Sequence, residues 1–251
     1  MTYKKAILRI ATLILLGAVC FSAASAEDVF AGGVKNLEEH GLSLDEVTEG
    51  YRLYLGEGNG FSFAISWDQD GNPLFTLFDV TGDGCVDLCH NRMFGSGMVR
   101  IDLDVYDPVT GKGYVLDGYN YDFLIKGVSG DRLRVVREGP HGYGDPVTQI
   151  EGMLLFAADR LLYAAESEPD EPHPDLSQAA VSFDQAVLYA AEYVKEKPEI
   201  KYFNEVRYSP AAGGTGPAWS VTFLFCGQEA CAVLVNAATG EIEQFSVPEK
   251  E

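Results

Sequence analysis

Short runs of alternating apolar and polar residues, separated by turn-forming residues, are the feature that most constrains the fold of this chain. Ile101, Leu103 and Val105 alternate with polar or aromatic neighbours, which is typical of a strand with one buried face. The segment that follows, residues 107–112, contains Pro and Gly, the residues that set or permit the backbone angles of a turn. Because many such runs follow one another closely, the sequence predicts an antiparallel, meander-like sheet.

Two groups of strands are predicted on this pattern. The first group comprises residues 61–67, 74–78, 98–106, 113–119, 121–128 and 132–137, with two more strands between 148 and 164. The second comprises residues 202–208, 219–225, 231–235 and 241–247, with a hairpin turn at 238–240. Helix starts are predicted where Ser43 precedes Glu46 and where Ser182 precedes Gln185, since Ser-x-x-Glu/Gln is the spacing of a capping box.

An acidic, proline-rich segment at residues 166–178 separates the two groups. It is nearly devoid of apolar residues, as an extended linker is. The sequence therefore predicts an α+β protein in two parts. An N-terminal antiparallel β-rich domain would span residues 27–165, and a small domain with one helix laid on an antiparallel sheet would span residues 179–251.

The N-terminus has the composition of an export signal. Three cationic residues precede an apolar run and a small-residue site that ends at Ala26, which is the order of a cleavable secretory signal. The run is shorter than the ~20 residues that a membrane-spanning helix needs. We therefore expect residues 1–26 to be removed and the mature chain to be periplasmic or secreted, without stable membrane insertion.

The mature chain would be strongly acidic. It keeps 15 of the 18 Lys and Arg residues and all 38 Asp and Glu residues, for a net charge of -23. A polyanion of this size repels phosphate backbones and anionic membranes, which excludes nucleic acid as an expected partner. A basic partner or a cation-rich environment is compatible with the charge.

Residues 79–87 carry the strongest chemical signal. Oxygen-bearing side chains recur at every second position and glycine stands at position 84, the arrangement in which a tight loop points hard ligands at a divalent cation. Magnesium fits less well than calcium, because it requires stricter octahedral geometry and keeps several waters. The spacing predicts a structural calcium site. Its ligands would be Asp79, Thr81, Asp83, the main-chain carbonyl of Cys85, and Asp87.

This loop resembles the short calcium loops of FG-GAP-type repeats and, less closely, EF-hand loops. Thr81 departs from the pattern, because Asn or Asp is usual there and a hydroxyl is a weaker ligand. His90 stands at the twelfth position, where an EF-hand has a closing acid. The resemblance therefore implies a shorter loop that closes on Asp87.

Four cysteines remain in the mature chain, and an even number in an exported protein favours disulfides. We predict the pairs Cys85–Cys89 and Cys226–Cys231, the second across a turn at residues 227–230. The first pair requires a turn between its members, since an extended strand would separate them by ~13 Å. The segment 85–90 also resembles a c-type haem attachment motif with one extra residue, and a zinc site of Cys85, Cys89 and His90 is a further alternative.

The C-terminal region resembles a PepSY-type domain. The features that carry this resemblance are the helix after Ser182, the Trp-Ser-Val sequence from Trp219, and the Thr-Gly-Glu sequence that ends at Glu241. PepSY-type domains occur in exported proteins and have been proposed to inhibit or chaperone proteases. The resemblance implies a binding module and brings no catalytic residues.

The sequence favours a non-enzymatic, exported calcium-binding protein that serves as a binding or interaction module, with another exported protein as its partner. No catalytic residues and no cofactor other than calcium are predicted. Two alternatives stay open: a hydrolase with a cation-ordered site between the domains, and a protease inhibitor or chaperone acting through the C-terminal domain. The hydrolase would require a deep pocket that holds a histidine or paired carboxylates away from the cation loop.

Overall fold

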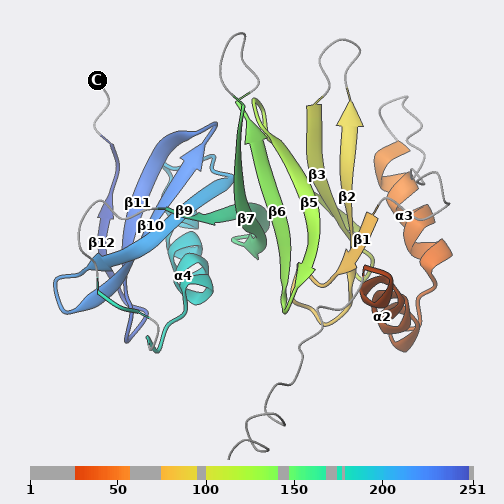
Figure 1. Ribbon diagram of the computed structural model, residues 1–251, viewed down its shortest axis with the longest axis horizontal. Helices are drawn as coiled ribbons and strands as arrows, with labels where there is room; N and C mark the ends of the chain where they lie inside the picture. The colour runs from red at the N-terminus through yellow and green to blue at the C-terminus, as the bar shows by residue number, and fades with distance from the viewer. Residues whose placement is uncertain are drawn as a thin grey trace, which may run out of the picture.

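The computed structural model describes residues 26–56, 75–94, 100–140, 147–167, 174–176 and 179–248 (Figure 1). The helices in these residues are α2 (Ala26–Glu39), α3 (Leu44–Gly56) and α4 (Phe183–Lys195). The strands are β1 (Phe75–Phe78), β2 (Asp87–Phe94), β3 (Arg100–Asp107), β4 (Lys112–Leu116), β5 (Asp122–Ser129), β6 (Arg132–Gly139), β7 (Thr148–Ala157), β8 (Arg160–Glu166), β9 (Glu205–Ala212), β10 (Pro217–Phe225), β11 (Gln228–Asn236) and β12 (Ile242–Ser246). The predicted α+β class is confirmed. The export signal before Ala26 and the strand predicted at 61–67 lie outside the described residues.

Both predicted helix starts are confirmed. The Glu46 amide donates to the Ser43 hydroxyl at 3.2 Å, and the Ser43 amide donates to the Glu46 carboxylate at 2.8 Å. Ser182 and Gln185 form the same reciprocal pair at the start of α4. Helix α2 was not predicted, because it carries two adjacent glycines. One of them is needed for packing, since a Cβ on Gly33 would lie 2.6 Å from Cβ of Leu77 on β1.

The strands form two sheets. The small sheet has the order β1-β2-β3-β4, and the large sheet has the order β12-β11-β10-β9-β8-β7-β6-β5. Neighbouring strands are antiparallel except β8 and β9, which are parallel. The predicted linker, residues 166–178, therefore begins at the last residue of β8 and forms, together with α4, part of the connection between two paired strands of one sheet. Most of that segment lies outside the described residues, and the division into two domains stays a prediction.

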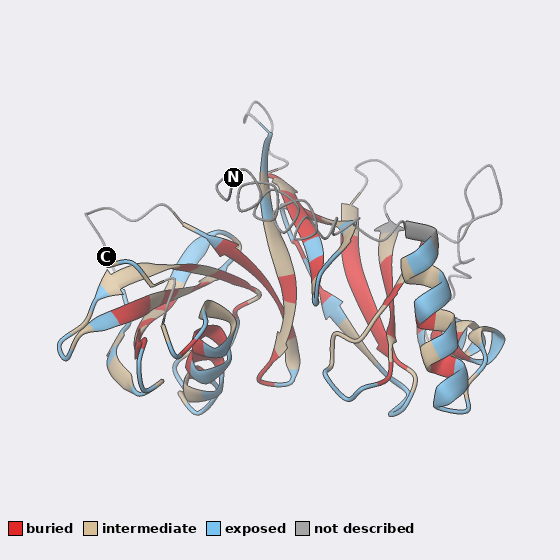
Figure 2. Cartoon of the chain, turned by 60° about the horizontal axis from the view of Figure 1, so that its bottom comes forward, coloured by how far each residue is buried: buried red, intermediate tan, exposed pale blue. Residues whose placement is uncertain are grey.

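Three cores hold these layers together. Helices α2 and α3 cover one face of the small sheet, and the other face of the small sheet packs on β5–β8. Helix α4 covers the large sheet where β7–β11 meet. Figure 2 shows buried residues concentrated on the strands, while the outer sides of α3 and α4 are exposed.

Two segments of the chain have the same architecture. A first unit consists of α3 followed by the four-stranded meander β1–β4, and a second unit consists of α4 followed by the meander β9–β12. Each begins with a capping box, in Ser43-Leu-Asp-Glu and in Ser182-Phe-Asp-Gln. Sequence reasoning missed this repeat, although the two tetrapeptides are visible in the sequence.

The turn between the third and fourth strands is also the same in both units. Asp107 and Asn236 each use a side-chain oxygen to accept the amides of the second and third residues that follow, at 2.8 to 3.1 Å. Gly111 and Gly240 follow with φ of 68° and 78°, a left-handed conformation that favours glycine. The common sequence Asx-x-x-Thr-Gly therefore forms the same turn in both units.

The residues on the sheet face opposite the helix differ between the two units, because this face packs against other strands only in the first unit. In the first unit this face is packed against β5–β8 by Cys89, Leu103, Val105 and Leu116. Strand pairing places Ser220, Ala232, Leu234 and Ser246 at the equivalent positions of the second unit. Small and polar residues therefore replace most of the core residues on the face that carries no second sheet.

A buried ion pair links the two halves of the large sheet. Arg137 on β6 donates to both carboxylate oxygens of Glu205 on β9 at 2.7 Å, and Arg207 donates to the same carboxylate at 2.8 Å. Glu205 is 2% exposed. Removing one partner of such a group leaves uncompensated charge in a low-dielectric site.

We therefore expect Glu205→Ala to lower the free energy of unfolding by about 3–5 kcal/mol, because two arginines lose their partner. Urea unfolding would measure this loss. The matched control is Glu151→Ala, which removes an exposed ion pair with Arg134 and should cost at most about 1 kcal/mol. Equal losses in the two variants would contradict the assignment.

Candidate functional site

The predicted calcium loop connects β1 to β2 and turns tightly. Gly82 and Gly84 have φ of 77° and 93°, and their amides donate to the two oxygens of Asp79 at 2.7 and 2.9 Å. The Asp83 carboxylate accepts the amide of Cys85 at 2.9 Å. Two of the three predicted carboxylate ligands are thus held by the amides of the loop itself.

Asp87, the third predicted carboxylate ligand, is buried at the start of β2. It accepts the amides of Val80 and Thr81 at 2.8 Å each, and the Thr81 hydroxyl at 3.3 Å. Burial raises the pKa of this carboxyl to about 7, although the two amide hydrogen bonds act in the opposite direction. Asp87 therefore closes the loop through hydrogen bonds; its predicted role as a calcium ligand stays a prediction.

Within the described residues no group of three or more His, Cys, Asp or Glu side chains is arranged to hold a metal ion. The donors of residues 79–87 are oxygens, the type that calcium prefers, but the three carboxylates turn to backbone amides instead of toward one another. Ion binding would require the side chains to turn inward. Calcium binding stays a prediction.

Asn36 of α2 fastens this loop to the helix layer. Its side-chain amide donates to the carbonyl of Gly84 at 3.1 Å, and its side-chain oxygen accepts the amide of Val86 at 2.9 Å. Sequence reasoning could not find this contact, because Asn36 lies far from the loop in the chain and on a helix that was not predicted.

Replacing Asn36 by Ala should lower the free energy of unfolding by about 1–3 kcal/mol, because two polar groups of the loop lose their partner. Thermal and urea unfolding would measure the change. Lys35→Ala, on the exposed side of the same helix, should change stability by less than about 0.5 kcal/mol. A neutral Asn36→Ala variant would refute the anchoring role.

The four cysteines are free thiols in this structure. Strand β10 ends at Phe225 and β11 begins at Gln228, so the hairpin turn is Cys226-Gly227 and the turn predicted at 227–230 is wrong. Cys231 lies opposite Phe223 in the hairpin. Cys85 is in the loop and Cys89 is on β2, and both are buried. The two disulfides stay predictions.

The alternatives for segment 85–90 meet a geometric obstacle. Residues 87–94 form a strand that was not predicted, and successive side chains on a strand point to opposite faces. Cys89 faces the core with β5–β8, whereas His90 faces Tyr51 of α3. A zinc site or a haem attachment that combines these two side chains does not fit this strand.

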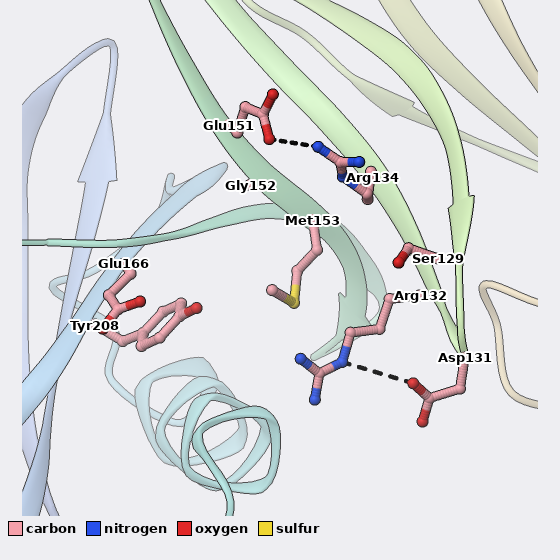
Figure 3. Close-up of a pocket in the computed structure, with 9 residues that line it drawn as sticks. All are labelled: Ser129, Asp131, Arg132, Arg134, Glu151, Gly152, Met153, Glu166 and Tyr208. Atoms are coloured by element: carbon pink, nitrogen blue, oxygen red, sulfur yellow. Dashed lines mark hydrogen bonds and ion pairs between the residues drawn. The ribbon is translucent and has the colours of Figure 1, made fainter. Parts of the chain in front are cut away.

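A pocket of about 400 Å³ lies on the large sheet beside α4, where the two predicted domains meet (Figure 3). Its lining is mixed in charge: Arg132 and Arg134 of β6, Glu151 and Met153 of β7, Glu166 of β8, and Tyr208 of β9. We call this the junction pocket. No histidine is among its described lining residues.

The charged groups of the junction pocket are held in defined positions. Arg132 donates to Asp184 of α4 at 2.6 Å, and its guanidinium lies 4.5 Å from the centre of the Phe183 ring. Arg134 pairs with Glu151. Figure 3 shows Met153 between the arginine side and the side formed by Glu166 and Tyr208. Cationic, anionic and apolar groups therefore share one open surface.

A second polar cluster is buried between α3 and the small sheet. Tyr51 of α3 donates to Asp104 Oδ2 at 2.9 Å and lies 3.1 Å from His90 Nδ1. Arg92 Nε lies 2.8 Å from the same Asp104 oxygen. The alternation in β3 suggested a solvent face for Asp102 and Asp104, yet these residues are 1% and 0% exposed. That expectation was wrong because α3 covers this face.

A scan against models of protein families finds no match, and a search of curated proteins finds no match either. Among solved structures, the chain is similar to the C-terminal domain of YpeB from Bacillus megaterium, with 10% identity, 69% of this chain and 93% of that chain covered, and a TM-score of 0.19. At this TM-score the likeness carries no argument. In the part of the chain described, no helix is long and apolar enough to cross a membrane.

Proposed function

We propose that this protein is an exported, non-enzymatic binding protein that is stabilised by calcium and holds a segment of another exported protein in the junction pocket. The observation that carries this proposal is the pocket itself, which lies where the antiparallel strands β5–β8 meet the second unit at β9. Its arginines, carboxylates and apolar groups match a polypeptide, which offers both charges and apolar side chains on one strand.

The C-terminal half supports a binding role in a second way. Residues 179–248 contain one helix packed on an antiparallel meander, which is the coarse arrangement that a PepSY-type domain implies. A PepSY-type assignment, and with it action on proteases as an inhibitor or chaperone, belongs to this proposal. In such a role the pocket would engage its partner without chemical change.

Calcium would act on the folded form of the protein. Asp79, Thr81, Asp83, the carbonyl of Cys85 and Asp87 would supply the oxygens, and the loop is tied to both β2 and α2. An ion that binds only the folded state stabilises it by mass action, by about 2.7 kcal/mol at a concentration 100 times Kd.

Calorimetric titration of the chelated protein should therefore release or absorb heat with calcium, and the Tm should rise by about 5–10 °C at saturation. Asp79→Asn combined with Asp83→Asn should abolish both effects. Thr81→Asp should tighten binding, because a carboxylate replaces a weak hydroxyl ligand. Glu199→Gln with Glu229→Gln, which removes the same charge elsewhere, should leave binding unchanged. The absence of binding heat at millimolar calcium would contradict the proposed calcium binding.

The binding role is tested separately by a photo-crosslinking residue placed at Ser129, which lines the junction pocket. We expect it to join the full-length protein to a defined exported protein in the cells that make it, and Arg134→Ala to reduce the yield several-fold. The matched control is the same residue at Val109, an exposed position in the β3–β4 turn. Identical products from both positions would contradict a partner in the pocket. A captured protease would favour the inhibitor or chaperone reading.

A further inference from the structure

The two units place different residues in the same helix-on-sheet core. In the first unit the sheet positions beneath α3 are His90, Arg92, Asp102 and Asp104. Strand pairing, counted from Asp107 and Asn236, places Val221, Phe223, Cys231 and Val233 at the equivalent positions beneath α4. The helix residue above them is Tyr51 in the first unit and Ala190 in the second.

The fold therefore does not require charge at these positions. The four apolar residues of the second unit are at most 1% exposed and form its core. Buried ion pairs can usually be replaced by apolar residues of similar volume without loss of stability. A charged cluster in one of two otherwise equivalent cores needs a reason other than stability.

The hydrogen bonds of the cluster form a directed chain. A tyrosine hydroxyl has one proton, and the hydroxyl of Tyr51 gives it to Asp104 Oδ2. The contact with His90 Nδ1 must then run from the imidazole N–H to the Tyr51 oxygen. His90 therefore carries a proton on Nδ1, and its burial disfavours a second proton on Nε2. Tyr51 connects this imidazole at one end to the Asp104 carboxyl at the other.

Asp104 has room for one proton. Its Oδ2 is engaged by Tyr51 and Arg92, whereas its Oδ1 is buried and has no hydrogen-bond partner within the described residues. A buried carboxylate oxygen without a hydrogen-bond donor favours protonation, although Arg92 and the Tyr51 hydroxyl act in the opposite direction. Burial accordingly raises the pKa of Asp104 to about 6, and burial together with Arg92 lowers the pKa of His90 to about 4.

We propose that Asp104, Tyr51 and His90 form a proton-balanced latch for α3, in which lifting the helix off the sheet releases one proton from Asp104 to solvent and takes up one proton from solvent at His90. In mildly acidic solution the closed latch holds its proton on Asp104 Oδ1 and the open latch holds it on the imidazole. The two exchanges with solvent cancel. Opening of α3 is therefore independent of pH over a range where either group alone would make it pH-dependent.

The signs of the two contributions are opposite. Asp104 has a higher pKa closed than open, so on its own it makes opening harder as the pH falls from about 6 to about 4. His90 has a lower pKa closed than open, so on its own it makes opening easier as the pH falls over the same range. The other titratable and charged groups that face this pair are Tyr54 of α3, Arg92 of β2, and Asp102 and Tyr106 of β3, with Arg100 paired to Asp102.

Hydrogen exchange of the α3 amides, corrected for the intrinsic effect of pH, would measure the opening equilibrium in the full-length protein at fixed calcium. Between pH 6.0 and 4.5 the wild-type value should change less than about threefold, because no net proton is exchanged. When the pH falls from 6.0 to 4.5, the opening equilibrium constant of Asp104→Asn should increase by up to about thirtyfold, and that of His90→Gln should decrease by a similar factor. The uptake or release of one proton changes this constant by up to about tenfold per pH unit.

The matched control is Tyr51→Phe with His90→Val and Asp104→Val, which removes the three titratable groups of the latch and gives two of the four sheet positions the residues of the second unit. It should fold, as judged by circular dichroism, and its α3 opening should not vary with pH. Slopes of the same sign in the two single variants, or no slope in either, would overturn the latch. If Asp104→Asn does not fold, the pH dependence of α3 opening in His90→Gln decides. Opening that increases or stays constant as the pH falls in this variant would overturn the latch.

Discussion

Strand β8 is the element on which the rest of the structure depends. Its residues Leu161–Ala165 are all buried, and they alternate between two cores. Leu161, Tyr163 and Ala165 face the small sheet, while Leu162 and Ala164 face α4. The same strand pairs antiparallel with β7 and parallel with β9. Burial of apolar surface on both faces, at about 25 cal/mol per Å², therefore joins the two halves of the molecule in one strand.

Much of the fold was predictable because local signals agreed with the tertiary structure. Capping boxes at Ser43 and Ser182 gave two helices, and alternation gave most strands. The failures have a common physical cause. Strand β2 carries polar side chains that became buried only because α3 covers them, and α2 contains Gly33, which contact with Leu77 explains. Long-range contacts decided these cases, and no local pattern encodes them.

The candidate sites also differ in whether local sequence or long-range contacts determine them. The sequence located the tight loop closed by Asp87, because loop chemistry is local, but it could not foresee that backbone amides engage all three carboxylates. The junction pocket draws residues from five strands, and the Tyr51–His90–Asp104 chain draws from a helix and two strands. Neither has a linear motif. The repeated unit was the signal that sequence reasoning missed. It provides an apolar core beneath α4 with which the charged core beneath α3 can be compared.

The parallel pairing of β8 with β9 also bears on how the chain reaches its native state. A parallel neighbour needs a crossover connection, and here the crossover contains α4, the helix that later covers the same sheet. The C-terminal meander can extend the sheet only after residues 161–165 are in place, while the antiparallel hairpins β5–β8 can form from neighbouring segments. Closure of the β8–α4–β9 connection is a non-local event and is therefore expected to be slow. Until it occurs, β8 presents an unpaired edge that could join another chain.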